Sequence, residues 1–80
     1  MLTVEVKYFA VLRDRRGIDH ESVETGQATV QGLFVELSDR HGFGLPSQVV
    51  RYAVNGAFVD AATRLNPGDE VVFIPPVAGG

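Results

Sequence analysis

The stretch from Thr29 to Gly42 reads TVQGLFVELSDRHG and predicts the main helix of this chain. Its apolar residues recur at i, i+3, i+4 and i+7, a spacing that places them on one face of a helix. These residues are Val30, Leu33, Phe34 and Leu37. Thr29 can cap the first turn through its hydroxyl, and Gly42 suits the left-handed conformation that commonly ends a helix. The sequence therefore indicates a helix that packs one face against a core.

Two strands are predicted before this helix. Residues 2–9 alternate between apolar and polar and include β-branched residues, so we expect a half-buried strand with Phe9 on its polar face. The residues expected on its buried face are Leu2, Val4, Val6 and Tyr8. Residues 20–24 carry more charge and fit a weaker strand at the edge of a sheet. Between the two strands, residues 10–16 fit either a helical turn or a loop, which Gly17 would end.

A hairpin and one further strand are predicted after the helix. Asn55-Gly56 separates two apolar runs, and this dipeptide favours a tight turn because both of its residues need positive φ. With a two-residue loop, the buried face of the hairpin consists of Tyr52, Val54, Ala57 and Val59, and the outer face of Arg51, Ala53, Phe58 and Asp60. Residues 71–74 form the last strand, on which Ile74 falls on the outer face. Pro75-Pro76 ends this strand, because proline cannot donate to a strand ladder.

This order of elements predicts an α+β fold. A single helix cannot cover both faces of the sheet. It must therefore pack across one face, as in a β-grasp or another α+β sandwich. A chain of this length buries only about 60–65% of the surface that its unfolded form exposes, which fits one small domain. We expect the domain to cover residues 1–74 and a flexible tail to protrude from it over residues 75–80.

Composition and charge exclude several classes of function. The chain has no cysteine, which excludes disulfides, thiol catalysis and thiolate metal sites. A net charge of −3 argues against nucleic-acid binding, and no apolar run approaches the ~20 residues of a membrane span. His20 and His41 are not at ligand spacing, so we expect no metal site. The first residues do not resemble a signal peptide, and a cytoplasmic location is expected.

The sequence ends in a tail that has few side-chain atoms, IPPVAGG over residues 74–80. Its paired prolines favour a stiff, extended backbone, and such a tail can thread a narrow channel into the active site of another protein. A terminal carboxylate is a poor electrophile and must become a mixed anhydride before a sulfur nucleophile can replace one of its oxygens. Because glycine has no Cβ, the carbonyl of Gly80 is not crowded.

The sequence resembles the MoaD/ThiS family of ubiquitin-like sulfur carriers over nearly its whole length. Four segments carry the resemblance: YFAxLR from Tyr8 to Arg13, VNG from Val54 to Gly56, LxxGDEV from Leu65 to Val71, and PPVAGG from Pro75 to Gly80. The terminal motif is the most specific of them. The FIPPVAGG ending and the length resemble the small subunits of molybdopterin synthase more than the carriers of the thiamine pathway.

The resemblance implies a mixed sheet in a ubiquitin-like β-grasp and a chemistry centred on Gly80, with Gly79 beside it. An E1-like adenylating enzyme would use ATP to activate the Gly80 carboxylate, and a sulfur donor would convert it to a thiocarboxylate. The tail would then insert into the large subunit of molybdopterin synthase, where sulfur passes to cyclic pyranopterin monophosphate for molybdenum cofactor biosynthesis. The chain itself would bind no cofactor and supply no acid–base side chain, so whether to call it an enzyme stays open.

Two alternatives to this function remain open. A carrier with the same chemistry can serve another pathway, such as thiamine or cysteine biosynthesis. A ubiquitin-like protein modifier or interaction module can use the same Gly-Gly end to form an isopeptide with a lysine or to dock.

Several residues outside the Gly-Gly end are candidates for partner binding. Phe9, Phe58 and Ile74 each fall on the polar face of a strand, and together they are either scattered surface residues or one docking patch. The resemblance implies docking through the sheet face near the tail, and it places Arg13 at the arginine position of the family. The tail residues expected to bind the same partner are Pro75, Pro76, Val77 and Ala78.

Overall fold

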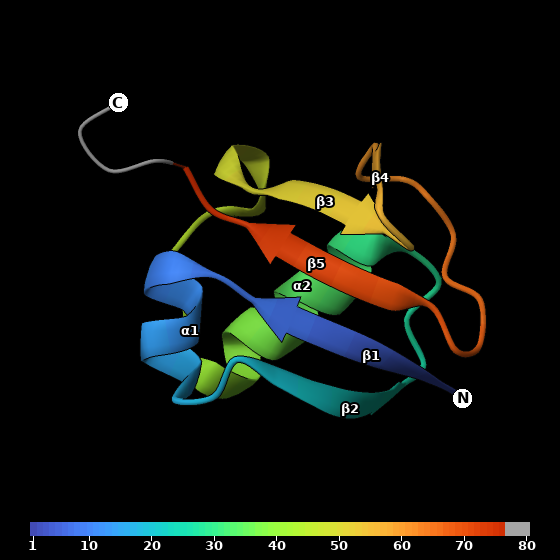
Figure 1. Ribbon diagram of the computed structural model, residues 1–80, viewed down its shortest axis with the longest axis horizontal. Helices are drawn as coiled ribbons and strands as arrows, with labels where there is room; N and C mark the ends of the chain where they lie inside the picture. The colour runs from blue at the N-terminus through green and yellow to red at the C-terminus, as the bar shows by residue number, and fades with distance from the viewer. Residues whose placement is uncertain (77–80) are drawn as a thin grey trace.

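The computed structural model describes residues 1–76, which form one sheet with two helices (Figure 1). In chain order the elements are β1 (Leu2–Tyr8), α1 (Ala10–Arg16), β2 (His20–Thr25), α2 (Val30–His41), a 3₁₀ turn (Ser47–Val49), β3 (Arg51–Val54), β4 (Ala57–Val59) and β5 (Glu70–Ile74). The strand order is β2-β1-β5-β3-β4. β1 and β5 are parallel and every other neighbouring pair is antiparallel, so the sheet is mixed. α2 lies across one face of it, which confirms the predicted α+β fold (Figure 1).

The main helix has the predicted bounds and caps. The Thr29 hydroxyl accepts a hydrogen bond from the Gly32 N–H at 3.1 Å, which satisfies one of the free donors of the first turn. At the other end Gly42 has a φ of 68° and its N–H donates to the Ser38 carbonyl. The four apolar residues of the stripe are all buried against the sheet.

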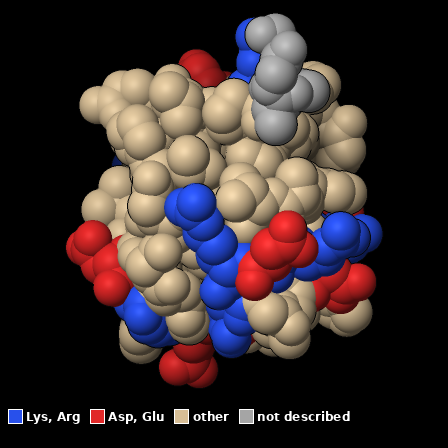
Figure 2. Space-filling view, turned by 90° about the vertical axis from the view of Figure 1, so that its left-hand side faces the viewer, with Lys and Arg blue, Asp and Glu red and all other residues tan. Residues whose placement is uncertain are grey.

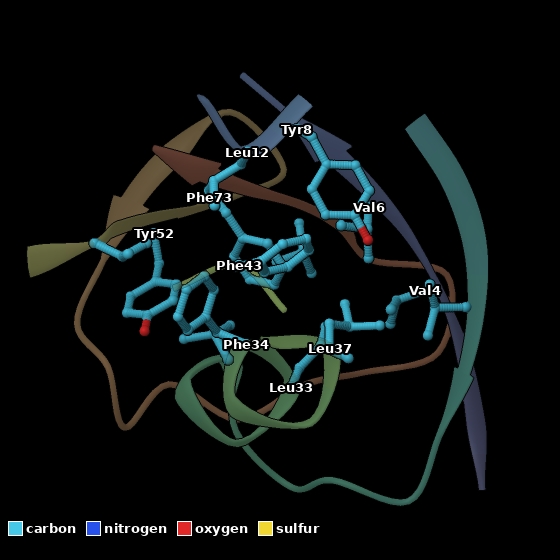
Figure 3. Close-up of a cluster of buried hydrophobic side chains, with 14 of the residues drawn as sticks. Val4, Val6, Tyr8, Leu12, Leu33, Phe34, Leu37, Phe43, Tyr52 and Phe73 are labelled. Atoms are coloured by element: carbon cyan, nitrogen blue, oxygen red, sulfur yellow. The ribbon is translucent and has the colours of Figure 1, made fainter. Parts of the chain in front are cut away.

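Aromatic rings fill the space between α2 and the sheet (Figure 3). The Phe34 ring on α2 lies 5.2 Å from the Phe73 ring on β5 and meets it edge to face. Phe43 is fully buried and packs 5.6 Å from Tyr8 of β1. The pattern of the sequence did not predict this core position, because Phe43 stands alone between two glycines outside any periodic apolar run.

The hairpin has the predicted register. Tyr52 pairs with Val59, Ala53 with Phe58 and Val54 with Ala57, around a turn in which Asn55 and Gly56 both have positive φ. One detail of the predicted facing was wrong. Of the four residues expected to be buried, Tyr52 is buried, Val54 and Val59 are half-buried, and Ala57 is exposed. β4 is a three-residue edge strand with a neighbour on one side only, so its inner face is poorly covered.

The segment that fitted either a helical turn or a loop is helical. It forms α1, whose end is marked by Gly17 with a φ of 87°. β2 pairs only with β1 and is an edge strand, as predicted. Within residues 1–76, no helix combines the length and the apolar character that a membrane span requires.

Candidate functional site

The predicted reactive end follows the strand β5. Val77, Ala78, Gly79 and Gly80 lie outside the described residues. The residues that lead to them are described: Ile74 is half-buried at the end of β5, Pro75 is buried and Pro76 is exposed. The chain therefore leaves the domain surface between the two prolines.

A buried carboxylate fixes the start of β5. Asp69 Oδ2 accepts from the Asn66 N–H at 2.8 Å, and Asp69 Oδ1 accepts from Asn55 Nδ2 at 3.0 Å. The Asn55 side chain also accepts from the Glu70 N–H at 2.9 Å. These bonds tie the hairpin turn to the first residue of β5. Asn55-Gly56 was predicted as the hairpin turn and GDEV was noted as a family motif, but their contact across 14 residues has no local signal.

β5 is held in the middle of the sheet, between β1 and β3. Phe73 lies between Tyr8 of β1 and Tyr52 of β3, and its ring packs on both of theirs. With the strand fixed at its start and along its length, the exit point of the tail has a defined position on the domain.

The predicted docking residues come together on the face of the sheet that α2 leaves open. Phe58 is 71% exposed and Phe9 is 49% exposed, which confirms that both rings point away from the core. Cross-strand pairs connect them: Phe58 faces Ala53, Ala53 faces Val72, and Ile74 follows two residues later on β5. Phe9 follows Tyr8, the partner of Phe73, and so lies at the level of Ile74. We call Phe9, Ala53, Phe58, Val72 and Ile74 the outer-face patch.

Arg13 lies beside this patch and not within it. Phe9 is the N-cap residue of α1, and its carbonyl accepts from the Leu12 N–H at 3.1 Å. Ala10 has a φ of 51°, a conformation that few residues other than glycine adopt, and this turn directs α1 away from β1. As a result, Arg13 and Phe9 line one open recess at the end of β1.

α1 is anchored by a network that sequence analysis did not identify. The Tyr8 hydroxyl donates to Glu21 at 2.6 Å, and Arg16 holds the same carboxylate through two hydrogen bonds of 2.9 and 2.8 Å. Burial, reinforced by the bond to Glu21, raises the pKa of Tyr8 well above its usual range. The bonded Arg16 guanidinium lowers the pKa of Glu21. The network joins β1, β2 and α1 close to the point where the tail leaves the sheet.

Charge is distributed unevenly around this end of the molecule. Figure 2 looks onto the end that carries α1 and shows a broad uncharged surface above a band of charged side chains. Arg13, Arg15 and Arg16 all lie in the last turn of α1. In the part of the chain that the structure describes, no cluster of three or more His, Asp or Glu residues is arranged to hold a metal ion.

The sequence model of the ThiS family matches residues 6–80 of this chain. Two curated relatives carry the name molybdopterin synthase sulfur carrier subunit. The protein of Escherichia coli (strain K12) is 36% identical over 96% of this chain and 99% of its own length. That of Mycobacterium tuberculosis (strain ATCC 25618 / H37Rv) is 37% identical over the full length of both chains.

Solved structures give the same relationship at the level of the fold. The putative molybdopterin converting factor subunit 1 from Pyrococcus furiosus is 36% identical, with a TM-score of 0.80 over 96% of this chain and all of its own. SAMP1 from Haloferax volcanii is 27% identical, with a TM-score of 0.78 over 98% of this chain and 99% of its own. A chain in a complex of subunits 1 and 2 of molybdopterin-converting factor from Helicobacter pylori 26695 is 25% identical, with a TM-score of 0.67 over 99% of this chain and all of its own.

Proposed function

This chain belongs to the ThiS family, and on that premise we propose that it is the sulfur-carrier subunit of a molybdopterin synthase. The observation that carries the proposal is the end-to-end match, at 36% and 37% identity, to two proteins named for that role. Because the 37% match covers the whole chain and the family model extends to residue 80, they support one function for domain and tail together.

The reacting group in this proposal is the Gly80 carboxylate. An E1-like enzyme transfers AMP from ATP to the carboxylate, and a sulfur donor then displaces AMP to leave a thiocarboxylate. In the large synthase subunit the sulfur passes to cyclic pyranopterin monophosphate. Acid–base groups come from that subunit, and this chain contributes the sulfur and its position. We expect the chain to bind no cofactor of its own.

The fold suits a carrier because the reactive end and the docking surface share one strand. β5 ends in Ile74, a member of the outer-face patch, and the tail continues from it. A partner that covers the exposed Phe9 and Phe58 rings would receive the tail at a fixed place relative to them. The Helicobacter pylori complex of subunits 1 and 2 supports a large subunit as that partner, because one chain of that complex resembles this chain in fold and sequence. Arg13, Pro75, Pro76, Val77 and Ala78 complete the proposed contact.

Two further points belong to the proposal. The proposed domain comprises residues 1–74, and the proposed tail over residues 75–80 enters the partner from the point where the chain leaves the surface, between Pro75 and Pro76. The expected compartment is the cytoplasm, because activation of the carboxylate consumes ATP.

Reconstitution with purified proteins tests the proposal. Thiocarboxylated chain, mixed with the large subunit and cyclic pyranopterin monophosphate, should yield molybdopterin in an amount limited by the thiocarboxylate supplied. Chain with an ordinary carboxylate is the matched control and should yield none. Sulfur transfer only to an acceptor of another pathway would refute the molybdopterin assignment and retain the carrier chemistry.

A second function is favoured by one observation. A structure of similar fold and 27% identity, SAMP1, is also known as a small archaeal modifier protein. A protein modifier would leave its C-terminal glycine joined to lysines of other proteins. Mass spectrometry of cell lysate for branched peptides in which this tail is joined to lysines of other proteins distinguishes the two roles, because a dedicated carrier leaves no conjugates on other proteins.

A further inference from the structure

The sequence has seven Lys and Arg residues in total. Lys7 is the only lysine among them, and the others are arginines. The chain also has no cysteine. An activated carboxylate reacts readily with free amines and thiols, whereas a guanidinium group remains protonated and does not attack. Lys7 Nζ is therefore the one strongly nucleophilic side-chain atom that this protein offers to an activated C-terminus.

Lys7 lies on the open face of the sheet, near the point where the chain leaves β5. It pairs with Val72 of β5, and its side chain is 48% exposed. The Glu70 carboxylate lies 3.5 Å from the Lys7 amine and is itself 46% exposed. An exposed ion pair of this kind is weak, so it keeps the amine at the surface without locking it there.

A histidine lies beside Lys7 on the neighbouring strand. His20 of β2 is the direct cross-strand partner of Lys7 of β1, and such partners have Cβ atoms about 4.5–5.5 Å apart on one face. His20 Nδ1 lies 2.7 Å from Asp19 Oδ1. With its proton on Nδ1, His20 donates to Asp19 and presents Nε2 as the acceptor nitrogen of the ring. Nε2 can then accept the proton that the uncharged Lys7 amine releases when it attacks.

The same residues line an open recess of about 430 Å³ at the end of β1. Its walls are Lys7, Tyr8, Phe9, Arg13, Asp19 and His20. Arg13 supplies a cation that can hold a carbonyl oxygen as negative charge develops on it. A tail that ends in two glycines has no side chain to obstruct its entry into the recess.

We propose that Lys7 is an acceptor site for the activated Gly-Gly carboxylate of a second copy of this chain, and the inference rests on the proposed activation of Gly80. The uncharged Lys7 amine attacks the carbonyl carbon of the acyl-adenylate. The C–N bond forms, the bond from that carbon to the phosphate oxygen breaks, AMP leaves, and the proton released from nitrogen passes to His20. The product is an isopeptide-linked dimer whose acceptor copy keeps its own tail.

A second copy suits this site better than the chain's own tail. Lys7 is level with Val72, two residues before the end of β5, and Pro75-Pro76 follows that end. Because paired prolines favour extended backbone, the chain's own tail would have to reverse along its own strand to reach Lys7.

The test uses the full chain with its adenylating enzyme and ATP, and without a sulfur donor. ATP–pyrophosphate exchange reports activation. Intact mass reports a species of twice the chain mass less one water, and fragmentation of tryptic peptides locates the bond. We expect the wild type to form the dimer through Lys7 and Lys7→Arg to lose it with exchange unchanged. We expect His20→Asn to slow dimer formation about tenfold, less than the ~10²–10⁴ of optimised general bases.

A relocated lysine provides the matched control. Arg40 lies on α2, on the other side of the sheet, and has an ion pair with Glu36 of 3.6 Å, similar to that of Lys7. The double variant Lys7→Arg, Arg40→Lys should not recover the dimer if the site around Lys7 matters.

Other outcomes overturn the proposal. Recovery in the double variant, a bond at the Met1 amine, a cyclic monomer, or exchange without any dimer would each refute Lys7 as the acceptor and leave the carrier function intact. Absence of exchange would refute the carrier function instead. In that case the full chain prepared as a C-terminal thioester presents an activated end without the enzyme, and failure of this form to acylate Lys7 refutes the acceptor site independently.

Discussion

At the residue scale, Asp69 shows how one buried carboxylate positions the strand that leads to the predicted reactive end. It is 7% exposed and accepts hydrogen bonds from the Asn66 backbone and the Asn55 side chain. Both donors lose their partner if the carboxylate is removed, and an unsatisfied buried polar group costs more than the net worth of one hydrogen bond. The GDEV motif thus has a structural role that is separate from partner binding.

Asp69→Ala should lower the free energy of unfolding by about 1–3 kcal/mol, because two donors are left without an acceptor. Urea unfolding measures this change. Asp39→Ala is the control, since Asp39 is exposed on α2, and its effect should stay within about 0.5 kcal/mol. Equal effects of the two variants would show that the Asp69 network contributes no stability.

Glu21 makes the stability of the fold depend on pH. The bond from Arg16 lowers the pKa of Glu21 below its ordinary value of 4.5, so the folded state favours the charged carboxylate. The resulting stability is fully present above pH 4.5 and is lost as the pH falls through the lower pKa of the folded state.

Glu21→Gln should therefore cost about 1–2 kcal/mol at pH 7, where the charged network is complete, and the cost should shrink towards zero in acid. Denaturant midpoints of both proteins at pH 7 and below pH 4 provide the comparison. A difference that stays constant with pH would mean that the charge of Glu21 does not stabilise the fold.

Phe58 is the residue that best separates docking from folding. Its ring is 71% exposed, so the core does not require it. If the outer-face patch binds the large subunit, Phe58→Ala should weaken binding by about 1–4 kcal/mol, measured by calorimetry, and change stability by about 0.5 kcal/mol or less.

Val35→Ala is the matched control for Phe58→Ala. Val35 is 44% exposed on α2, on the opposite side of the molecule from the patch, and its truncation should leave binding unchanged. If both variants bind as tightly as the wild type, the docking surface lies elsewhere.

At the scale of the elements, sequence predicts best what local residues determine. α2 has its apolar stripe and both caps within 14 consecutive residues, from Thr29 to Gly42, and it forms with those bounds. The hairpin register follows from Asn55-Gly56 alone. Tyr8 is different, because its hydroxyl partner Glu21 lies 13 residues away on another strand. Alternation indicates which side of a strand is buried, but it gives no partner for a buried polar atom.

The candidate site also combines features that local sequence determines with features that depend on distant residues. The outward facing of Phe9 and Phe58 follows from alternation. Their connection through Ala53 and Val72 depends on strand order, which local pattern does not determine. Residues 77–80 hold the predicted reactive end and lie outside the described residues, so the role of Gly79-Gly80 stays a prediction from sequence and family.

Deletion of Gly79 and Gly80 should abolish sulfur transfer and change the free energy of unfolding by no more than about 0.5 kcal/mol, as is typical of surface changes. The reason is that, within residues 1–76, Phe73 is the last large apolar residue to be fully buried. Thermal unfolding and the transfer assay on one preparation give both values. A large drop in melting temperature would show that the tail packs structurally.

At the scale of the whole molecule, the fold places the proposed docking patch and the start of the tail near each other. α2 covers one face of the sheet (Figure 1). The other face carries the outer-face patch, with Phe9 and Phe58 exposed. The parallel pairing of β1 with β5 brings Phe9 and the start of the tail to the same end of the sheet. In the proposed function, the domain can thus deliver a chemical group to a partner, because docking and delivery would use adjacent surfaces.

The most direct test of the central claim is the intact mass of the chain, freshly purified after expression with its own adenylating enzyme and sulfur donor. We expect a fraction of the protein to carry one sulfur in place of one oxygen, and fragmentation to locate the change at Gly80. We expect the variant without Gly79 and Gly80 to lack that fraction. A wild-type chain that shows only the unmodified carboxylate, with ATP, enzyme and donor all present and active, would contradict its role as a sulfur carrier.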